Sequence, residues 1–181
     1  MGELLISWTV RLALICWTAA TGMLVLRMAA ALFSVYRLLW TIGAVLFTFH
    51  VLAAFHFAHQ WSHTAAILHT AEETEKLIGW RFGEGLWFSY LFVALWAADA
   101  ADLWLRPGVR RDNLYSRSYL GMQLYLWFIA FNGAVIFESG VTRIPGIIVT
   151  LILSSLIIAA RIRTRGGAAV AMDNSSACEE Q

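Results

Sequence analysis

All five histidines of the 181-residue chain fall between positions 50 and 69, and this clustering has more chemical content than any other feature of the sequence. They are His50, His56, His59, His63 and His69. Imidazole nitrogen binds Zn, Cu, Fe and Ni, so histidines at suitable spacing predict a transition-metal site. The segment is therefore the first candidate for a functional site.

Helical spacing selects three of these histidines as ligands. On a helix with about 100° per residue, His56, His59 and His63 fall within about 60° of one another and share one face. Three imidazoles leave a coordination position for a further ligand, and His69 and Glu138 are candidates for it, with Glu72 as an alternative. The sequence thus predicts that His56, His59, His63, His69 and Glu138 bind Zn, Cu or Fe. Catalytic metal sites also keep one coordination position free for water or substrate, so the sequence does not decide whether the protein is an enzyme.

Haem b is the second candidate cofactor, because imidazole is a common axial ligand of haem iron. His50 and His56 are the candidate axial ligands. Two axial imidazoles need facing positions, whereas all five histidines belong to one segment, so haem would require the chain to fold back or a dimer to share it. Haem therefore ranks below a bare metal ion. The histidines could instead serve only as hydrogen-bonding groups near the membrane surface.

His50 and Asp99 form a second candidate pair, because they fall at similar depth in two neighbouring apolar segments. A carboxylate inside a bilayer is costly unless it is paired, protonated or hydrated. Pairing with His50 would lower that cost and could serve proton transfer. A small proton-coupled transporter is therefore an alternative function.

Composition identifies the element type that must position these residues. Hydrophobic residues make up 60% of the chain and charged residues 14%, whereas an average soluble domain has about 45–50% apolar and about 25% charged residues. This excess excludes a water-soluble single domain, and two cysteines exclude a disulfide scaffold. The net charge of +1 gives no reason to expect nucleic-acid binding. We expect an all-α, polytopic transmembrane helix bundle in contact with the lipid bilayer.

Five stretches approach the length of about 20 apolar residues that a membrane-spanning helix needs. They cover about 4–26, 38–60, 86–105, 120–137 and 144–160, with 12–36 as an alternative for the first. The outer segment 61–85 is rich in His and Glu, with Ser62 as a helix cap and a second helix start predicted at Thr70. The tail 166–181 is predicted to be disordered and cytoplasmic.

The basic residues predict the orientation of these five spans. With the N-terminus outside, nine of the thirteen Lys and Arg residues fall on the inner side and three on the outer side. Cytoplasmic loops carry an excess of Lys and Arg, so this distribution favours an N-out, C-in topology.

The text FHFAHQWSHTAAILHTAEET, followed by GEGLWFSYLF and WAAD, resembles an uncharacterised group of bacterial multi-span membrane proteins with a His-rich FHFxHxWSH…HTA segment. The resemblance covers the stretch from His50 to Asp99. It implies an integral protein of the bacterial cytoplasmic (inner) membrane. No activity is assigned to that group, so the resemblance implies no function.

Three hypotheses follow from these patterns. The leading one is an integral membrane protein that binds a transition metal, or haem, through its outer histidine cluster. A non-catalytic structural or assembly subunit, bound to another membrane protein or to a second copy, is the next. The transporter that uses His50 and Asp99 is the third.

Overall fold

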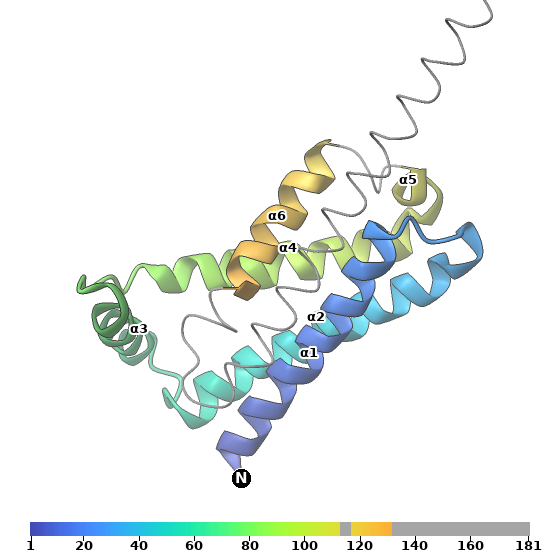
Figure 1. Cartoon of the computed structure of the whole chain (residues 1–181). Coiled ribbons are helices and arrows are strands. Elements are labelled where there is room, and N and C mark those ends of the chain that lie inside the picture. The colour runs from blue at the N-terminus through green and yellow to red at the C-terminus, as the bar shows by residue number, and fades with distance from the viewer. Residues whose placement is uncertain (113–116, 132–181) are drawn as a thin grey trace, which may run out of the picture.

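The computed structural model describes residues 1–112 and 117–131. Within these ranges the chain forms helices joined by turns, and no strand occurs. The elements are α1 (Gly2–Val25), the short 3₁₀ helix η1 (Ala30–Leu32), α2 (Phe33–Phe57), α3 (His63–Ile78), α4 (Gly85–Leu105), α5 (Pro107–Asp112) and α6 (Arg117–Phe131). α1 and α2 lie side by side and antiparallel, α4 packs against α2, and α6 packs against α4 (Figure 1). The all-α class is confirmed for the described part of the chain.

Three helices are long and apolar enough to span a membrane: Gly2–Val25, Ala30–Phe57 and Gly85–Leu105. They correspond to the first three predicted spans. The alternative first span, 12–36, is wrong because the chain turns at Arg27, whose φ is 52°. The second helix ends at Phe57, three residues before the predicted boundary.

The later spans are described only in part. α6 (Arg117–Phe131) overlaps residues 120–131 of the fourth predicted span. The fifth span, 144–160, and the tail, 166–181, lie outside the described residues. Five spans and the N-out orientation therefore stay predictions.

Large apolar side chains cover the outside of the three spanning helices. Examples with more than 40% of their surface exposed are Leu12 and Ile15 on α1, Leu38 and Phe49 on α2, and Leu91 on α4. In water such a surface would be unfavourable. Helices that are apolar all round suit a bilayer, where acyl chains contact the outer faces.

Aromatic rings pack in the buried core where α2 meets α4. Trp40 and Trp96 are both buried, with their ring centroids 5.4 Å apart. Phe47 meets Phe92 edge to face at 4.7 Å. Such pairs contribute about 0.5–1.5 kcal/mol beyond the area that they bury, so this core fixes how α4 sits on α2.

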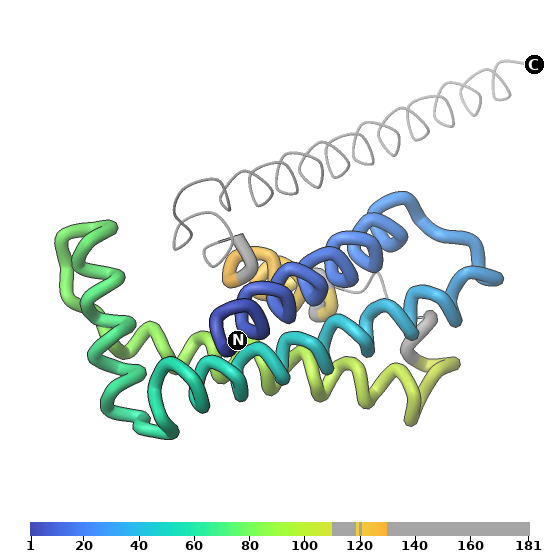
Figure 2. Tube along the Cα trace, turned by 90° about the horizontal axis from the view of Figure 1, so that it is seen from below, coloured from blue at the N-terminus to red at the C-terminus, as the bar shows by residue number. Residues whose placement is uncertain are grey.

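The two ends of the bundle differ in chemistry. α2 ends and α4 begins at the same end, and α3 lies across it (Figure 2). We call this the histidine end. The opposite end contains η1, the start of α2 with Arg37 and the end of α4 with Trp104, and we call it the arginine end.

Candidate metal site at the histidine end

A tight turn separates α2 from α3 and determines where the histidines point. Gln60 and Trp61 both have left-handed backbone, with φ of 48° and 60°. For residues other than glycine this conformation costs about 1–3 kcal/mol each, and it persists only where surrounding contacts hold it. One such contact is the Trp61 N–H, which donates to the Phe55 carbonyl at 2.8 Å.

Ser62 starts α3 immediately after this turn. Its Oγ accepts a hydrogen bond from the Ala65 N–H at 3.2 Å, which confirms the cap predicted there. The second helix start predicted at Thr70 is wrong, because Thr70 lies within α3 and its hydroxyl donates to the Ala66 carbonyl. α3 ends at Gly79, whose φ of 73° is the left-handed conformation that glycine adopts without strain.

The turn brings His59 and His69 together. Their ring centroids are 5.4 Å apart and the rings are inclined by 53°. His59 follows the end of α2 and His69 lies in the middle of α3. Since Zn–N bonds are about 2.0–2.1 Å long, nitrogens that share an ion lie within about 4 Å of each other. The two rings are near enough for small side-chain rotations to meet this condition.

His59 has a lowered pKa. Partial burial is the main cause, because it disfavours the charged form of the imidazole. The neighbouring His69 lowers the pKa further, because it disfavours a positive charge beside its own. A lower pKa keeps the His59 imidazole neutral near pH 7. Neutral imidazole is the form that binds a metal, so the position favours ligation over protonation.

His56 and His63 face other partners. The Trp61 Nε1–H donates to His56 Nδ1 at 3.1 Å, while His63 Nδ1 shares a hydrogen bond of 2.9 Å with the Tyr90 hydroxyl. The expectation that His56, His59 and His63 share one helical face is wrong, because α2 ends at Phe57 and the chain turns before His63.

The candidate haem ligands also have separate neighbours. His50 donates from Nδ1 to the Ile6 carbonyl at 2.9 Å and so connects α2 to α1. His56 lies near the end of α2, next to Trp61. The structure therefore does not bring His50 and His56 to one point. Asp99 is buried in α4, and its pairing with His50 stays a prediction.

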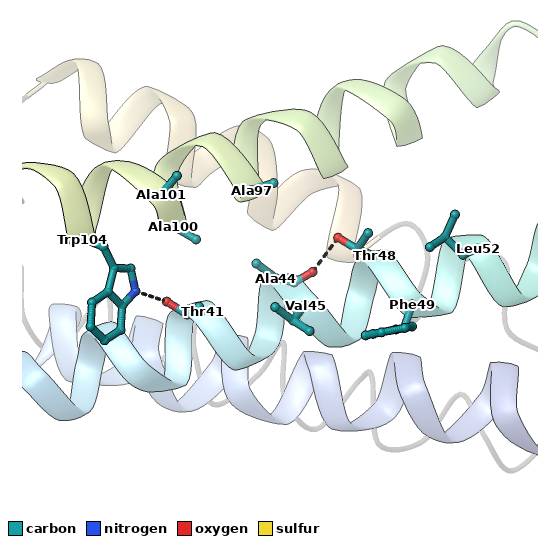
Figure 3. A pocket seen from close by; sticks show the side chains of 10 residues that line it. All are labelled: Thr41, Ala44, Val45, Thr48, Phe49, Leu52, Ala97, Ala100, Ala101 and Trp104. Carbon is teal, nitrogen blue, oxygen red and sulfur yellow. Dashed lines mark hydrogen bonds between the residues drawn. The ribbon is translucent and has the colours of Figure 1, made fainter.

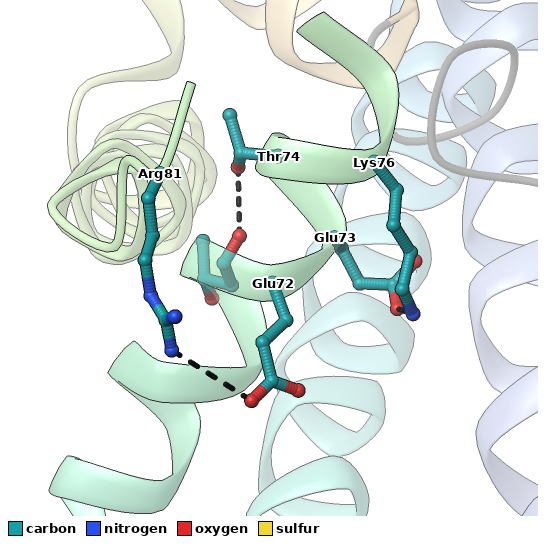
Figure 4. A network of polar contacts seen from close by, with 6 residues as sticks. Glu72, Glu73, Thr74, Lys76 and Arg81 are labelled. Carbon is teal, nitrogen blue, oxygen red and sulfur yellow. Dashed lines mark hydrogen bonds and ion pairs between the residues drawn. The ribbon is translucent and has the colours of Figure 1, made fainter. Parts of the chain in front are cut away.

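Ion pairs cover the exposed face of α3 (Figure 4). Lys76 binds the Glu73 carboxylate at 2.6 Å, and Arg81 lies 3.9 Å from both Glu72 and Glu75. The hydrogen bond from Lys76 lowers the pKa of Glu73, and the charge of nearby His69 lowers it further. Glu73 is thus an anion whose charge acts on His69, four residues earlier on α3, while its carboxylate is bound by Lys76.

Among residues 1–112 and 117–131, no group of three or more His, Cys, Asp or Glu side chains is placed to hold a metal ion. Glu138 lies outside these ranges. The structure supplies a pair of histidines where the sequence predicted a larger set. In the sequence, the helix cap at Ser62 was the sign that His59 and His69 could meet. A helix that starts at Ser62 is separate from α2, so the chain has to turn between them.

No protein-family model, curated protein or solved structure matches this chain. The candidate site therefore has to be judged on its own geometry. Two imidazoles at an exposed turn, a lowered pKa on one and a carboxylate beside the other are the features that bear on function.

Proposed function

We propose that this chain is an integral membrane protein that binds a transition metal ion, Zn, Cu or Fe, with His59 and His69 as its central ligands. The observation that carries the proposal is the approach of these two rings to 5.4 Å across the α2–α3 turn. The strained backbone at Gln60 and Trp61 supports it, since such strain concentrates at ligand clamps and active sites.

Water and Glu138 are the candidates for the remaining coordination positions. Zinc sites with fewer than four protein ligands keep positions open for water or substrate. His69 is exposed and His59 half-buried, so an ion can reach both from solvent. We place the site on the outer face of the bacterial cytoplasmic membrane, in keeping with the basic residues on the other side.

Metal analysis of the purified protein tests this function. The full chain in detergent would be dialysed against Zn²⁺ or Cu²⁺, and bound metal counted by mass spectrometry of the elements. We expect near-stoichiometric metal in the wild type, and an affinity at least about tenfold lower in His59→Gln and His69→Gln. His56→Gln and His63→Gln are the matched controls and should retain the metal. Equal metal content in all five proteins would refute the site.

The assembly-subunit hypothesis is the second candidate, and the contacts of His56 and His63 favour it. Each of these rings makes a hydrogen bond to an aromatic side chain, Trp61 or Tyr90. Used in this way, His56 stabilises the turn after α2, and His63 stabilises the start of α3 against α4, without any cofactor. Two results together would favour this role. The wild-type protein would bind no metal, and His56→Gln or His63→Gln would lose a membrane partner or the dimeric state.

A further inference from the structure

An apolar cavity of about 350 Å³, open on the outside of the bundle, lies between α2 and α4 (Figure 3). Small side chains create it, because Ala44 on α2 faces Ala97 and Ala101 on α4 where larger residues would close the gap. Ligand pockets in proteins range over roughly 300–1,000 Å³, so the cavity can hold a molecule or part of one.

The cavity has the length of one membrane leaflet. It extends along α2 from Thr41 to Leu52, and eleven residues of helix measure about 16 Å. This is about half of the roughly 30 Å thickness of the hydrocarbon core. A helix about 10 Å wide would fill on the order of 1,000 Å³ over this length, so the cavity suits a thinner, extended occupant.

The positively charged side chain of Arg37 lies at the arginine end of the cavity. Arg37 lies over the Trp104 ring, with its guanidinium carbon 3.9 Å from the ring centroid, and Trp104 donates from Nε1 to Thr41 Oγ at 2.9 Å. The Arg37 Nε is buried and meets no acceptor among the described residues. The neighbouring Asp102 carboxylate is occupied by Arg106.

We propose that the cavity binds one acyl chain of an anionic phospholipid whose phosphate is held by Arg37. Guanidinium donors match phosphate oxygens, and tryptophan prefers the level of the head groups, where Trp104 would lie. The inference requires only that α2 and α4 cross a bilayer, and it is independent of metal binding at the histidine end.

Photocrosslinking in nanodiscs tests the charge requirement. The full chain would be reconstituted with phosphatidylglycerol or phosphatidylcholine that carries a diazirine in one acyl chain, and labelled peptides identified by mass spectrometry. We expect phosphatidylglycerol to label residues 41–52 and 97–104 more strongly than phosphatidylcholine does. Arg37→Gln should lower the phosphatidylglycerol label about fivefold. Arg27→Gln, which removes one charge from the same end but not from the cavity, should leave the label unchanged.

A second pair of variants tests the cavity itself. Ala97→Phe fills the space and should abolish labelling, whereas Ala98→Phe, at an exposed position beside it that does not line the cavity, should not. Circular dichroism and gel filtration check folding, and Arg37→Gln decides alone if Ala97→Phe fails to fold. Equal labelling by both lipids, an unchanged label in Arg37→Gln, or label that falls outside residues 41–52 and 97–104 would overturn the proposal.

Discussion

The rings of His59 and His69 lie 5.4 Å apart, although ten positions separate these residues in the chain and they belong to different elements. Their approach depends on the left-handed backbone at Gln60 and Trp61, which turns the chain between α2 and α3. The metal hypothesis therefore centres on a turn, and its ligands come from both sides of that turn.

The α2–α3 junction should loosen in acid. The pKa of His59 in the folded protein lies below its ordinary value of about 6.5, so the unfolded turn binds more protons in acid than the folded turn does. The neutral His59 imidazole therefore contributes fully to the stability of the turn above about pH 6.5, and this contribution is lost as the pH falls through the lowered pKa. Amide hydrogen exchange over residues 58–69, corrected for intrinsic rates, should show less protection at about pH 5.5 than at about pH 7.5.

The matched variant for this experiment is His59→Gln, which cannot be protonated. Its protection should vary less with pH than that of the wild type. Protection that is the same at both pH values in the wild type would contradict the lowered pKa. An unchanged pH effect in His59→Gln would assign it to another histidine.

His50→Leu should weaken the contact between α1 and α2 without changing metal content. The variant removes the donor to the Ile6 carbonyl, and hydrogen bonds between membrane helices contribute on average about 0.6 kcal/mol. Unfolding by added SDS in mixed micelles would measure the loss. Phe49→Leu, at a neighbouring position that is 58% exposed, should stay within about 0.5 kcal/mol of the wild type. If His50→Leu lost no more stability than Phe49→Leu, the hydrogen bond from His50 to Ile6 would not stabilise the contact between α1 and α2.

Gly43→Ala should destabilise the bundle. A Cβ at this position would lie 2.7 Å from Trp96 Cζ2 and 3.3 Å from the Cys16 Cβ, so α1 or α4 would have to shift. Overpacking of this kind costs about 1–3 kcal/mol. Gly22→Ala is the control, because among the described residues its Cβ would meet no atom within 4 Å beyond its own helix backbone and chain neighbours, and it should gain up to about 1 kcal/mol in helix propensity. The same SDS titration compares the two, and equal stabilities would contradict the close packing at Gly43.

The spanning helices could be predicted because length and apolarity determine them directly. The stretches 4–26 and 86–105 differ from α1 and α4 by at most two residues at each end. The aromatic contacts inside the bundle could not be predicted in this way. Trp40 and Trp96 face inward while Trp8 and Trp87 face outward, and a sequence that is apolar on all sides contains no periodicity to separate them.

The sequence predicted the segment that contains the candidate site, but not which of its histidines lie close together. Clustering identified the segment from His50 to His69, and His59 and His69 were among the expected ligands. The error was the assumption of one continuous helix through His56, His59 and His63. Glycine or asparagine usually marks a left-handed backbone, and neither residue stands at positions 60 and 61. The sequence therefore contains no sign of the turn at Gln60 and Trp61.

X-ray absorption at the metal edge tests the central claim most directly, because its fine structure counts imidazole ligands. Protein loaded with one Zn²⁺ per chain should show scattering from two imidazole rings at Zn–N distances of about 2.0–2.1 Å, with oxygen ligands that lack this ring scattering in the remaining positions. His69→Gln should show one imidazole fewer, and His63→Gln the wild-type spectrum. A wild-type spectrum without imidazole scattering, or one that His69→Gln leaves unchanged, would contradict a metal site at His59 and His69.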